Sequence, residues 1–349
     1  AIIGTHLTPE GLGRLAGRTR LLAFAGTGAA SYIDLPTARR LGITVTNVTG
    51  YGDRAVAELA LALLLAAARG VLDGDRAIRA GDWTGFAGTE LSGATVGVVG
   101  VGAVGRAFTA LVAALGMHVL VHDAHPVTDL AALAGPDAQQ VPLTELLSRA
   151  EAVSLHLPLT GATRGLLTAE HLDLLRPGAI LVNTARAELI APGALAARLA
   201  RGDLRAACDV FDPEPLPDDD PLLATPHTVL TPHLGFRTPQ ALGRMAEGAV
   251  ECVEAFIAGR PVWVVSCGGA SRHGPSRFGL SSPVYTAPRS SSALSCPRRS
   301  DACHPPARLP PARRPPCPTR SFSSRAAPPS HPSRHRTWPR AAGSPQATR

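Results

Sequence analysis

Three glycines follow a short apolar segment with the spacing of a phosphate-binding turn. Gly100, Gly102 and Gly105 come directly after residues 95–99, which predict a strand, and they open a predicted helix. Such a turn lets the backbone approach a pyrophosphate, which the amides and the dipole of a helix N-terminus attract. Asp123 ends the next predicted strand, 18 residues after the third glycine, where a carboxylate can accept from ribose hydroxyls. These residues together predict a dinucleotide-binding unit.

The residue after this acid bears on which dinucleotide binds. Ala124 follows Asp123, where an arginine could have compensated the charge of a 2′-phosphate. A 2′-phosphate would therefore meet an uncompensated carboxylate, so we expect NAD to be preferred over NADP.

Three ionisable residues follow other predicted strands. Arg186 and His233 come just after a strand each, and Glu214 lies in the loop after a third. In open parallel sheets, ligands bind outside the carboxyl ends of the strands. Taken singly, these residues could equally be a surface arginine, a loop acid and a histidine in a turn. Spacing alone leaves both interpretations open.

The elements that would position these residues alternate along the chain from residue 95 onward. This alternation predicts a doubly wound, mostly parallel α/β sheet. We expect strands at 1–6, 20–25, 43–48, 95–99, 119–122, 152–156, 179–183, 206–210 and 228–230. We expect helices from Thr8-Pro9, at 35–41, 53–69, 103–115, 143–148, 172–175 and 193–201, and a long one at 238–257. Helix 53–69 is apolar nearly all round, so we expect it to be buried between domains or subunits.

Charge divides the chain into two unequal parts. All 34 basic residues are arginine, which excludes Schiff-base and Walker-A lysine chemistry. Residues 266–349 hold 14 arginines and one acid, whereas residues 1–265 carry a net charge of −6. The basic part is rich in Pro and Ser and lacks periodicity, so we expect disorder there. It is either an arm for an acidic partner or an appendage without function. Its sparse aromatics favour the appendage and no nucleic-acid partner.

Apolar runs and cysteines narrow the class of protein further. The longest apolar run, Leu59 to Ala68, has 10 residues, fewer than the roughly 18 that a membrane span needs. Residues 1–265 contain only Cys208 and Cys252, too few for a disulfide framework or a cysteine-rich zinc site. We therefore expect a cytoplasmic protein with no metal and no membrane partner.

Four motifs in order give a specific resemblance. They are Leu155-His156-Leu157-Pro158-Leu159-Thr160, Gly178 to Arg186 (GAILVNTAR), Asp209 to Leu216 (DVFDPEPL) and Leu230 to Gly235 (LTPHLG). With the similar segments 26–28, 45–48 and 55–60, the chain resembles the D-isomer-specific 2-hydroxyacid dehydrogenases over most of residues 1–265.

The resemblance implies a Rossmann cofactor domain with a smaller, flavodoxin-like substrate domain. The expected parts are a substrate domain at 1–88, an NAD-binding domain at 89–236, a helix at 237–265 that returns to the substrate domain, and the tail at 266–349. Members of the family carry a further strand and helix before the point that matches Ala1, so we expect the substrate domain to be incomplete there. The resemblance also implies a homodimer.

Roles for single residues follow from the same resemblance. His233 would be the acid and base, Glu214 would pair with it, and Arg186 would hold the substrate carboxylate, which Gly26, Thr27 and Gly28 would bind through backbone amides. The implied NAD contacts are Gly100, Gly102, Ala103, Val104, Gly105, Asp123, Leu157, Pro158, Thr163, Thr184, Ala185 and Asp209, the last near the nicotinamide carboxamide.

The implied activity is NAD-dependent reduction of a small 2-keto acid to the D-2-hydroxy acid, and the reverse. Glu214 favours this activity over that of formate dehydrogenases, which carry glutamine there. Two alternatives are a defective NAD-binding remnant of the family and a non-catalytic NAD-sensing module. The expected pocket walls, 26–32, 49–54 and 235–238, carry no pattern that selects among glyoxylate, hydroxypyruvate, pyruvate and longer acids.

Overall fold

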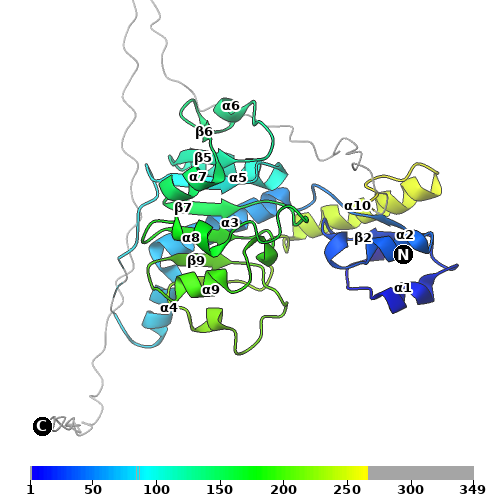
Figure 1. Ribbon diagram of the computed structural model, residues 1–349, viewed down its shortest axis with the longest axis horizontal. Helices are drawn as coiled ribbons and strands as arrows, with labels where there is room; N and C mark the ends of the chain where they lie inside the picture. Colours follow the sequence, from blue (N-terminus) through cyan, green and yellow to red (C-terminus); the bar gives the residue numbers. More distant parts are fainter. Residues whose placement is uncertain (1, 84, 86, 266–349) are drawn as a thin grey trace, which may run out of the picture. The chain divides into compact units, whose positions relative to one another are not determined.

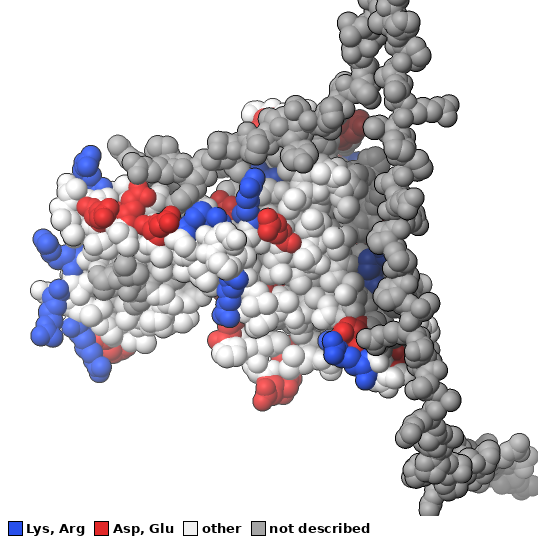
Figure 2. Space-filling model, turned by 180° about the vertical axis from the view of Figure 1, so that it is seen from behind, with Lys and Arg blue, Asp and Glu red and all other residues white. Residues whose placement is uncertain are grey.

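The computed structural model describes residues 2–83, 85 and 87–265, which belong to one compact unit (Figure 1). The tail at 266–349, for which we expect disorder, lies outside these residues. On the face in Figure 2, arginine and acidic side chains are both present, with wide uncharged areas between them.

Seven parallel strands form the larger sheet, in the order β10-β9-β8-β7-β4-β5-β6. Their bounds are β4 Thr95–Val99, β5 His118–His122, β6 Gln139–Gln140, β7 Ala152–Leu155, β8 Ile180–Asn183, β9 Arg205–Cys208 and β10 Thr228–Leu230. The chain passes from β4 to β5 and β6 on one side, then returns to β7 on the other side of β4. The strand order therefore reverses between β4 and β7, where such sheets bind ligands. The predicted doubly wound α/β fold is confirmed.

Helices cover both faces of this sheet (Figure 1). Their bounds are α3 Asp53–Arg69, α4 Val71–Arg79, α5 Ala103–Ala114, α6 Leu130–Ala134, α7 Leu143–Arg149, α8 Ala169–Asp173 and α9 Ala194–Leu199, with short 3₁₀ turns η2 Ala187–Leu189 and η3 Pro221–Ala224. One apolar cluster joins Val96 and Val98 to Leu64 and Phe108, and a second joins Leu146 to Val153 on the opposite face. Each fully buried side chain of this size contributes about 1.5–3 kcal/mol to stability.

Helix α3 has the predicted bounds and packs in two places. Ala55 in its first turn lies in an apolar cluster with Leu21 and Ala241, and the rest of the helix packs against α5 and β8. The first turn thus packs outside the seven-stranded sheet, and the position between domains or subunits stays a prediction. No single helix in the described chain is long and apolar enough to span a membrane, and α3 and α4 meet that criterion only as a pair bent by 62°.

A second parallel sheet has three strands in the order β1-β2-β3. The elements here are β1 Ile2–Ile3, β2 Leu21–Phe24, β3 Thr44–Thr46, α1 Pro9–Leu15, η1 Ala29–Ser31, α2 Leu35–Arg40 and α10 Pro239–Ile257. The hydroxyl of Thr8 accepts from Gly11 N–H at 3.2 Å, which confirms the predicted helix start. Helix α10 packs against β2, and the Val265 N–H then donates to the carbonyl of Val45 in β3.

Candidate active site

The glycine turn has the geometry that its spacing predicts. Gly100 has a φ of +94°, in the left-handed region that favours glycine. A Cβ on Gly105 would overlap the Gly100 carbonyl oxygen, whereas a Cβ on Gly102 would meet open space. Helix α5 starts immediately after Gly102 without a side-chain cap. Its first amides are therefore placed to bind an anion.

Asp123 is tied to this turn. Its Oδ2 accepts from Val101 N–H at 2.7 Å and its Oδ1 from His125 N–H at 3.0 Å. The Gly100 N–H donates to the His122 carbonyl at 2.8 Å, so the end of β5 lies beside the turn. The carboxylate thus stands beside the glycines with lone pairs left for further donors.

A cavity of about 500 Å³ opens at the turn. The predicted cofactor contacts that line it are Gly102, Ala103, Val104, Leu157, Pro158, Thr184 and Ala185; those that do not are Gly100, Gly105, Asp123, Thr163 and Asp209. Thr163 instead donates its hydroxyl to the Pro158 carbonyl at 2.6 Å, which holds the loop that lines the cavity.

An adjoining cavity of about 290 Å³ gathers the predicted catalytic and substrate-binding residues. Its walls include Gly26, Thr27 and Gly28 from the loop after β2, and Arg186, Glu214 and His233 from beyond β8, β9 and β10. The two cavities share Thr27, Gly28, Val56, Thr184 and Arg186. The structure therefore brings together six residues from four separate parts of the sequence, next to the cavity at the glycine turn.

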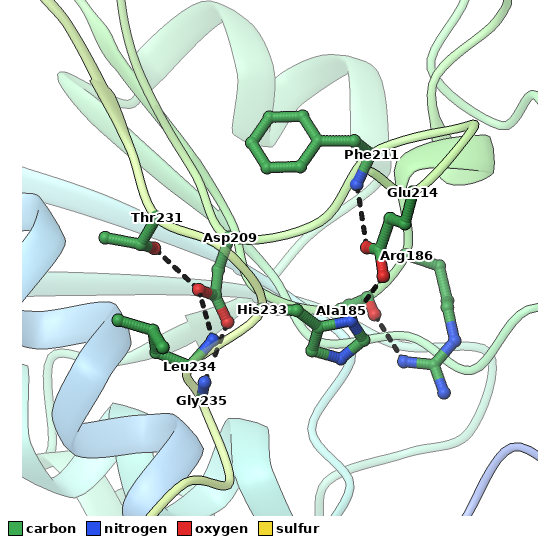
Figure 3. Close-up of polar contacts among 9 residues, drawn as sticks. All are labelled: Ala185, Arg186, Asp209, Phe211, Glu214, Thr231, His233, Leu234 and Gly235. Carbon is green, nitrogen blue, oxygen red and sulfur yellow. Dashed lines mark hydrogen bonds and ion pairs between the residues drawn. The ribbon is translucent and has the colours of Figure 1, made fainter. Parts of the chain in front are cut away.

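His233 and Glu214 form a pair in this cavity (Figure 3). His233 Nδ1 lies 2.8 Å from Glu214 Oε2, and Glu214 Oε1 accepts from Phe211 N–H at 3.0 Å. The carboxylate is fixed at both oxygens, so it can orient the ring. The pairing uses Nδ1 and leaves Nε2 for proton exchange with a ligand.

Asp209 holds the loop that carries His233 (Figure 3). It is 1 % exposed and accepts from Thr231 Oγ1 at 2.6 Å, Leu234 N–H at 2.7 Å and Gly235 N–H at 2.8 Å. His233 itself has a φ of +52°, a conformation that non-glycine residues adopt at a cost. The three hydrogen bonds on both sides of His233 fix that conformation. Sequence reasoning missed this contact and expected Asp209 only at the cofactor.

Arg186 faces both cavities. Its Nη1 donates to the Ala185 carbonyl at 2.6 Å, and Asn183 fixes the turn by donating to the Arg186 carbonyl at 2.9 Å. No ion pair joins Arg186 to a carboxylate in the described part of the chain. The remaining guanidinium donors are therefore available to an anion.

The loop at residues 26–28 is fixed by Asn47, a contact that sequence reasoning also missed. Asn47 Nδ2 donates to the Thr27 carbonyl at 2.9 Å, and its Oδ1 accepts from Ala29 N–H at 3.1 Å. Gly26 N–H donates to the Phe24 carbonyl at 2.9 Å. Of the three predicted carboxylate-binding amides, those of Thr27 and Gly28 are the two without an acceptor in the described residues.

His156 lies behind the glycine turn. It is buried, its ring lies 4.8 Å from that of Phe108, and neither ring nitrogen has a partner within the described residues. Burial lowers the pKa of His156 to about 3, so its ring is neutral at physiological pH. It lines the cofactor cavity as a neutral group.

Comparison with known proteins agrees with this geometry. The family model described as "D-isomer specific 2-hydroxyacid dehydrogenase, NAD binding domain" matches residues 61–235. The chain belongs to this family. The resemblance inferred from the sequence motifs is thereby confirmed, and the seven-stranded sheet with its glycine turn is the NAD-binding fold of the family.

Individual relatives agree with this membership. The chain is 40 % identical to a D-3-phosphoglycerate dehydrogenase of Mycobacterium leprae over 247 aligned residues. These residues make up 70 % of this chain and 46 % of the relative. It is 38 % identical over 255 residues to a glyoxylate reductase of Aeropyrum pernix, and the alignment covers 70 % of this chain and 75 % of the reductase. The solved TT0316 protein of Thermus thermophilus is 40 % identical, with a TM-score of 0.67 over 76 % of this chain and 84 % of that one. The chain spans about half the length of the phosphoglycerate dehydrogenases that it matches.

Proposed function

We propose that the chain is an NAD-dependent oxidoreductase that reduces a small 2-keto acid to the D-2-hydroxy acid and catalyses the reverse reaction. One observation carries this proposal. The His233–Glu214 pair and Arg186 meet in a cavity that adjoins the cavity of the glycine turn. A proton donor and an anion-binding group thus lie next to a dinucleotide site, as carbonyl reduction requires.

The residues at the turn fit a dinucleotide. Gly102 leaves open space where a Cβ would stand, and the uncapped first turn of α5 offers amides to a pyrophosphate. Asp123 would accept from the ribose hydroxyls and, with Ala124 beside it, would disfavour a 2′-phosphate. We therefore include a preference for NAD over NADP. The bound cofactor supplies the hydride that C2 of the keto acid receives.

Arg186 and the loop at 26–28 would hold the substrate. The guanidinium binds the C1 carboxylate through two of its donors and polarises the neighbouring keto oxygen. The free amides of Thr27 and Gly28 add donors from the opposite wall. These contacts orient C2 toward the cofactor cavity.

His233 would move the proton. In the direction of reduction, Nε2 donates a proton to the carbonyl oxygen while C2 receives the hydride, and in oxidation it takes the hydroxyl proton back. Glu214 keeps the ring in place through its contact with Nδ1. Asp209 keeps the backbone of His233 in the conformation that this pairing needs.

The test is the consumption of NADH by the purified full chain with a panel of 2-keto acids. We expect turnover of at least one acid, and a loss of about 100-fold or more in kcat for His233→Ala. NADH binding without turnover of any acid would contradict the proposal and favour the non-catalytic module or the remnant. The proposal includes a homodimer, which light scattering of the same preparation measures.

A further inference from the structure

The smaller cavity contains a second arginine that the proposed reaction does not use. Arg237 follows the loop of His233 and lines the same cavity as Arg186. Its N–H donates to the Leu234 carbonyl at 2.8 Å, which fixes the backbone there. The side chain is exposed, so Arg237 stands at the mouth of the cavity.

An aromatic ring places this guanidinium close to the reacting groups. Arg237 Cζ lies 6.0 Å from the centre of the Phe236 ring. The same ring stands edge-on to His233, at 5.8 Å, and to Tyr51, at 6.3 Å. The face of an aromatic ring attracts a guanidinium, which restricts the position of the arginine side chain while its positive charge is kept. Phe236 is therefore a neighbour of both the guanidinium and the imidazole.

The acids of the cavity do not neutralise this charge. Asp209 already accepts three hydrogen bonds from the loop of His233. Glu214 accepts one from Phe211 N–H and pairs with His233. No ion pair of Arg237 is present within residues 2–83, 85 and 87–265. With Arg186 likewise unpaired, the cavity offers two cations, of which the substrate's C1 carboxylate needs one.

We propose that the cavity selects 2-keto acids with a second anionic group, a carboxylate or a phosphate, at the far end of the side chain. Arg186 holds the C1 carboxylate and Arg237 holds the second anion. This inference rests on the proposed function and names the substrate class of the same site.

The lining of the cavity agrees with such a substrate. Phe24, Tyr32, Tyr51 and Phe236 belong to it, so the carbon chain of the substrate would meet aromatic side chains there. Burial raises the pKa of Tyr51, so its phenol stays neutral and adds no opposing charge. A wholly apolar side chain would cover Arg237 without replacing the water that solvates it, which is unfavourable. A terminal anion removes that penalty.

The experiment compares three acids of similar length with NADH: 2-oxoglutarate, 3-phosphohydroxypyruvate and the uncharged-tail acid 2-oxopentanoate. The full chain is assayed with Arg237→Ala and Arg237→Lys. Arg20→Ala is the matched control, because Arg20 is also exposed and lies over a phenylalanine ring, at 5.8 Å from that of Phe256, but does not line the cavity.

We expect the wild type to favour at least one of the two doubly charged acids in kcat/KM. Arg237→Ala should lower the ratio of that acid to 2-oxopentanoate about tenfold, mainly through KM, because the interaction is equal in ground state and transition state. Arg237→Lys should restore part of the ratio, and Arg20→Ala should leave it as in the wild type. The two charged acids distinguish a carboxylate from a phosphate. The KM of the preferred acid should also rise with ionic strength.

Two results would overturn the inference. If 2-oxopentanoate is reduced as efficiently as both charged acids, or if Arg237→Ala lowers all three equally, the cavity does not select a second anion while the proposed function stands. If none of the three acids, nor glyoxylate or pyruvate, is reduced, the proposed function and the inference both fail.

Discussion

Gly28 leaves the space that the Arg186 guanidinium occupies: a Cβ at residue 28 would overlap Nη2 of the arginine. Gly28 lies in the loop after β2 of the smaller sheet, and Arg186 lies in the loop after β8 of the larger one. Both residues line the two adjoining cavities. The free amide of Gly28 and the guanidinium thus converge on one point, where a carboxylate would receive donors from both.

Gly28→Ala tests this convergence. The φ of Gly28 is −110°, so alanine meets no backbone strain there and acts only through the added methyl group. The methyl should displace the guanidinium and raise the KM for the keto acid about tenfold or more. Steady-state kinetics measure the change. Gly13→Ala is the control, since its Cβ would meet nothing within 4 Å, and an equal loss in both variants would contradict the explanation.

Glu214→Gln tests the role of the carboxylate beside His233. Glutamine can still accept a hydrogen bond from the ring, but it offers no negative charge to the imidazolium. We expect kcat to fall on the order of 100-fold while the KM for NADH changes little. Glu145→Gln removes an acid that is paired with Arg149 on the surface of α7 and should keep full activity. Wild-type kcat in Glu214→Gln would contradict a catalytic role for the charge of the Glu214 carboxylate.

His156 predicts a dependence of stability on pH. Burial lowers its pKa from 6.5 to about 3, so below about pH 6.5 the unfolded chain binds a proton that the folded chain does not. The free energy of unfolding therefore decreases as the pH falls. Between pH 7 and pH 5, protonation of this one group in the unfolded chain lowers it by about 2 kcal/mol.

Urea unfolding of His156→Leu measures that loss, because the variant lacks the buried ring. We expect the wild type to lose about 2 kcal/mol more than the variant between the two pH values. His118→Gln, at an exposed position at the start of β5, should follow the wild type. Equal losses in His156→Leu and wild type would show that the ring is not held neutral by burial.

Asp123→Asn tests the preference for NAD. The amide oxygen of asparagine can still accept from Val101 N–H, whereas the charge that opposes a 2′-phosphate is gone. We expect the ratio of kcat/KM for NADPH to that for NADH to rise about tenfold or more. Asp137→Asn, at an exposed position, should leave the ratio unchanged. A wild type that uses both cofactors equally would contradict the preference.

Local signals in the sequence explain why much of the fold could be predicted. Helix α3 has the predicted bounds, Asp53–Arg69, because Gly70, with a φ of +59°, follows the last helical residue, where a left-handed residue commonly ends a helix. The turn between β4 and α5 is equally local. By contrast, the strand expected at 1–6 covers only Ile2–Ile3, since strand length is set by pairing with β2. Helix α4 was missed: it starts directly after Gly70, contains Gly74 and buries none of its nine residues.

The site was predicted residue by residue but not as an arrangement. Motifs pointed to Arg186, Glu214 and His233, which the structure brings to one cavity. The role of Asp209 as the acceptor for the loop of His233 depends on donors 22 to 26 residues away, and no local pattern encodes such a distance. The stacking of Arg237 beside the same cavity likewise depends on the fold.

The central claim is that hydride reaches C2 of a 2-keto acid while His233 supplies the proton. The most direct measurement uses NADH carrying deuterium at both positions of C4 and analyses the product by mass spectrometry and chiral chromatography. We predict a 2-hydroxy acid of D configuration with one deuterium at C2, and no such product above background from His233→Ala. A product without deuterium, or equal yields from both proteins, would contradict the account.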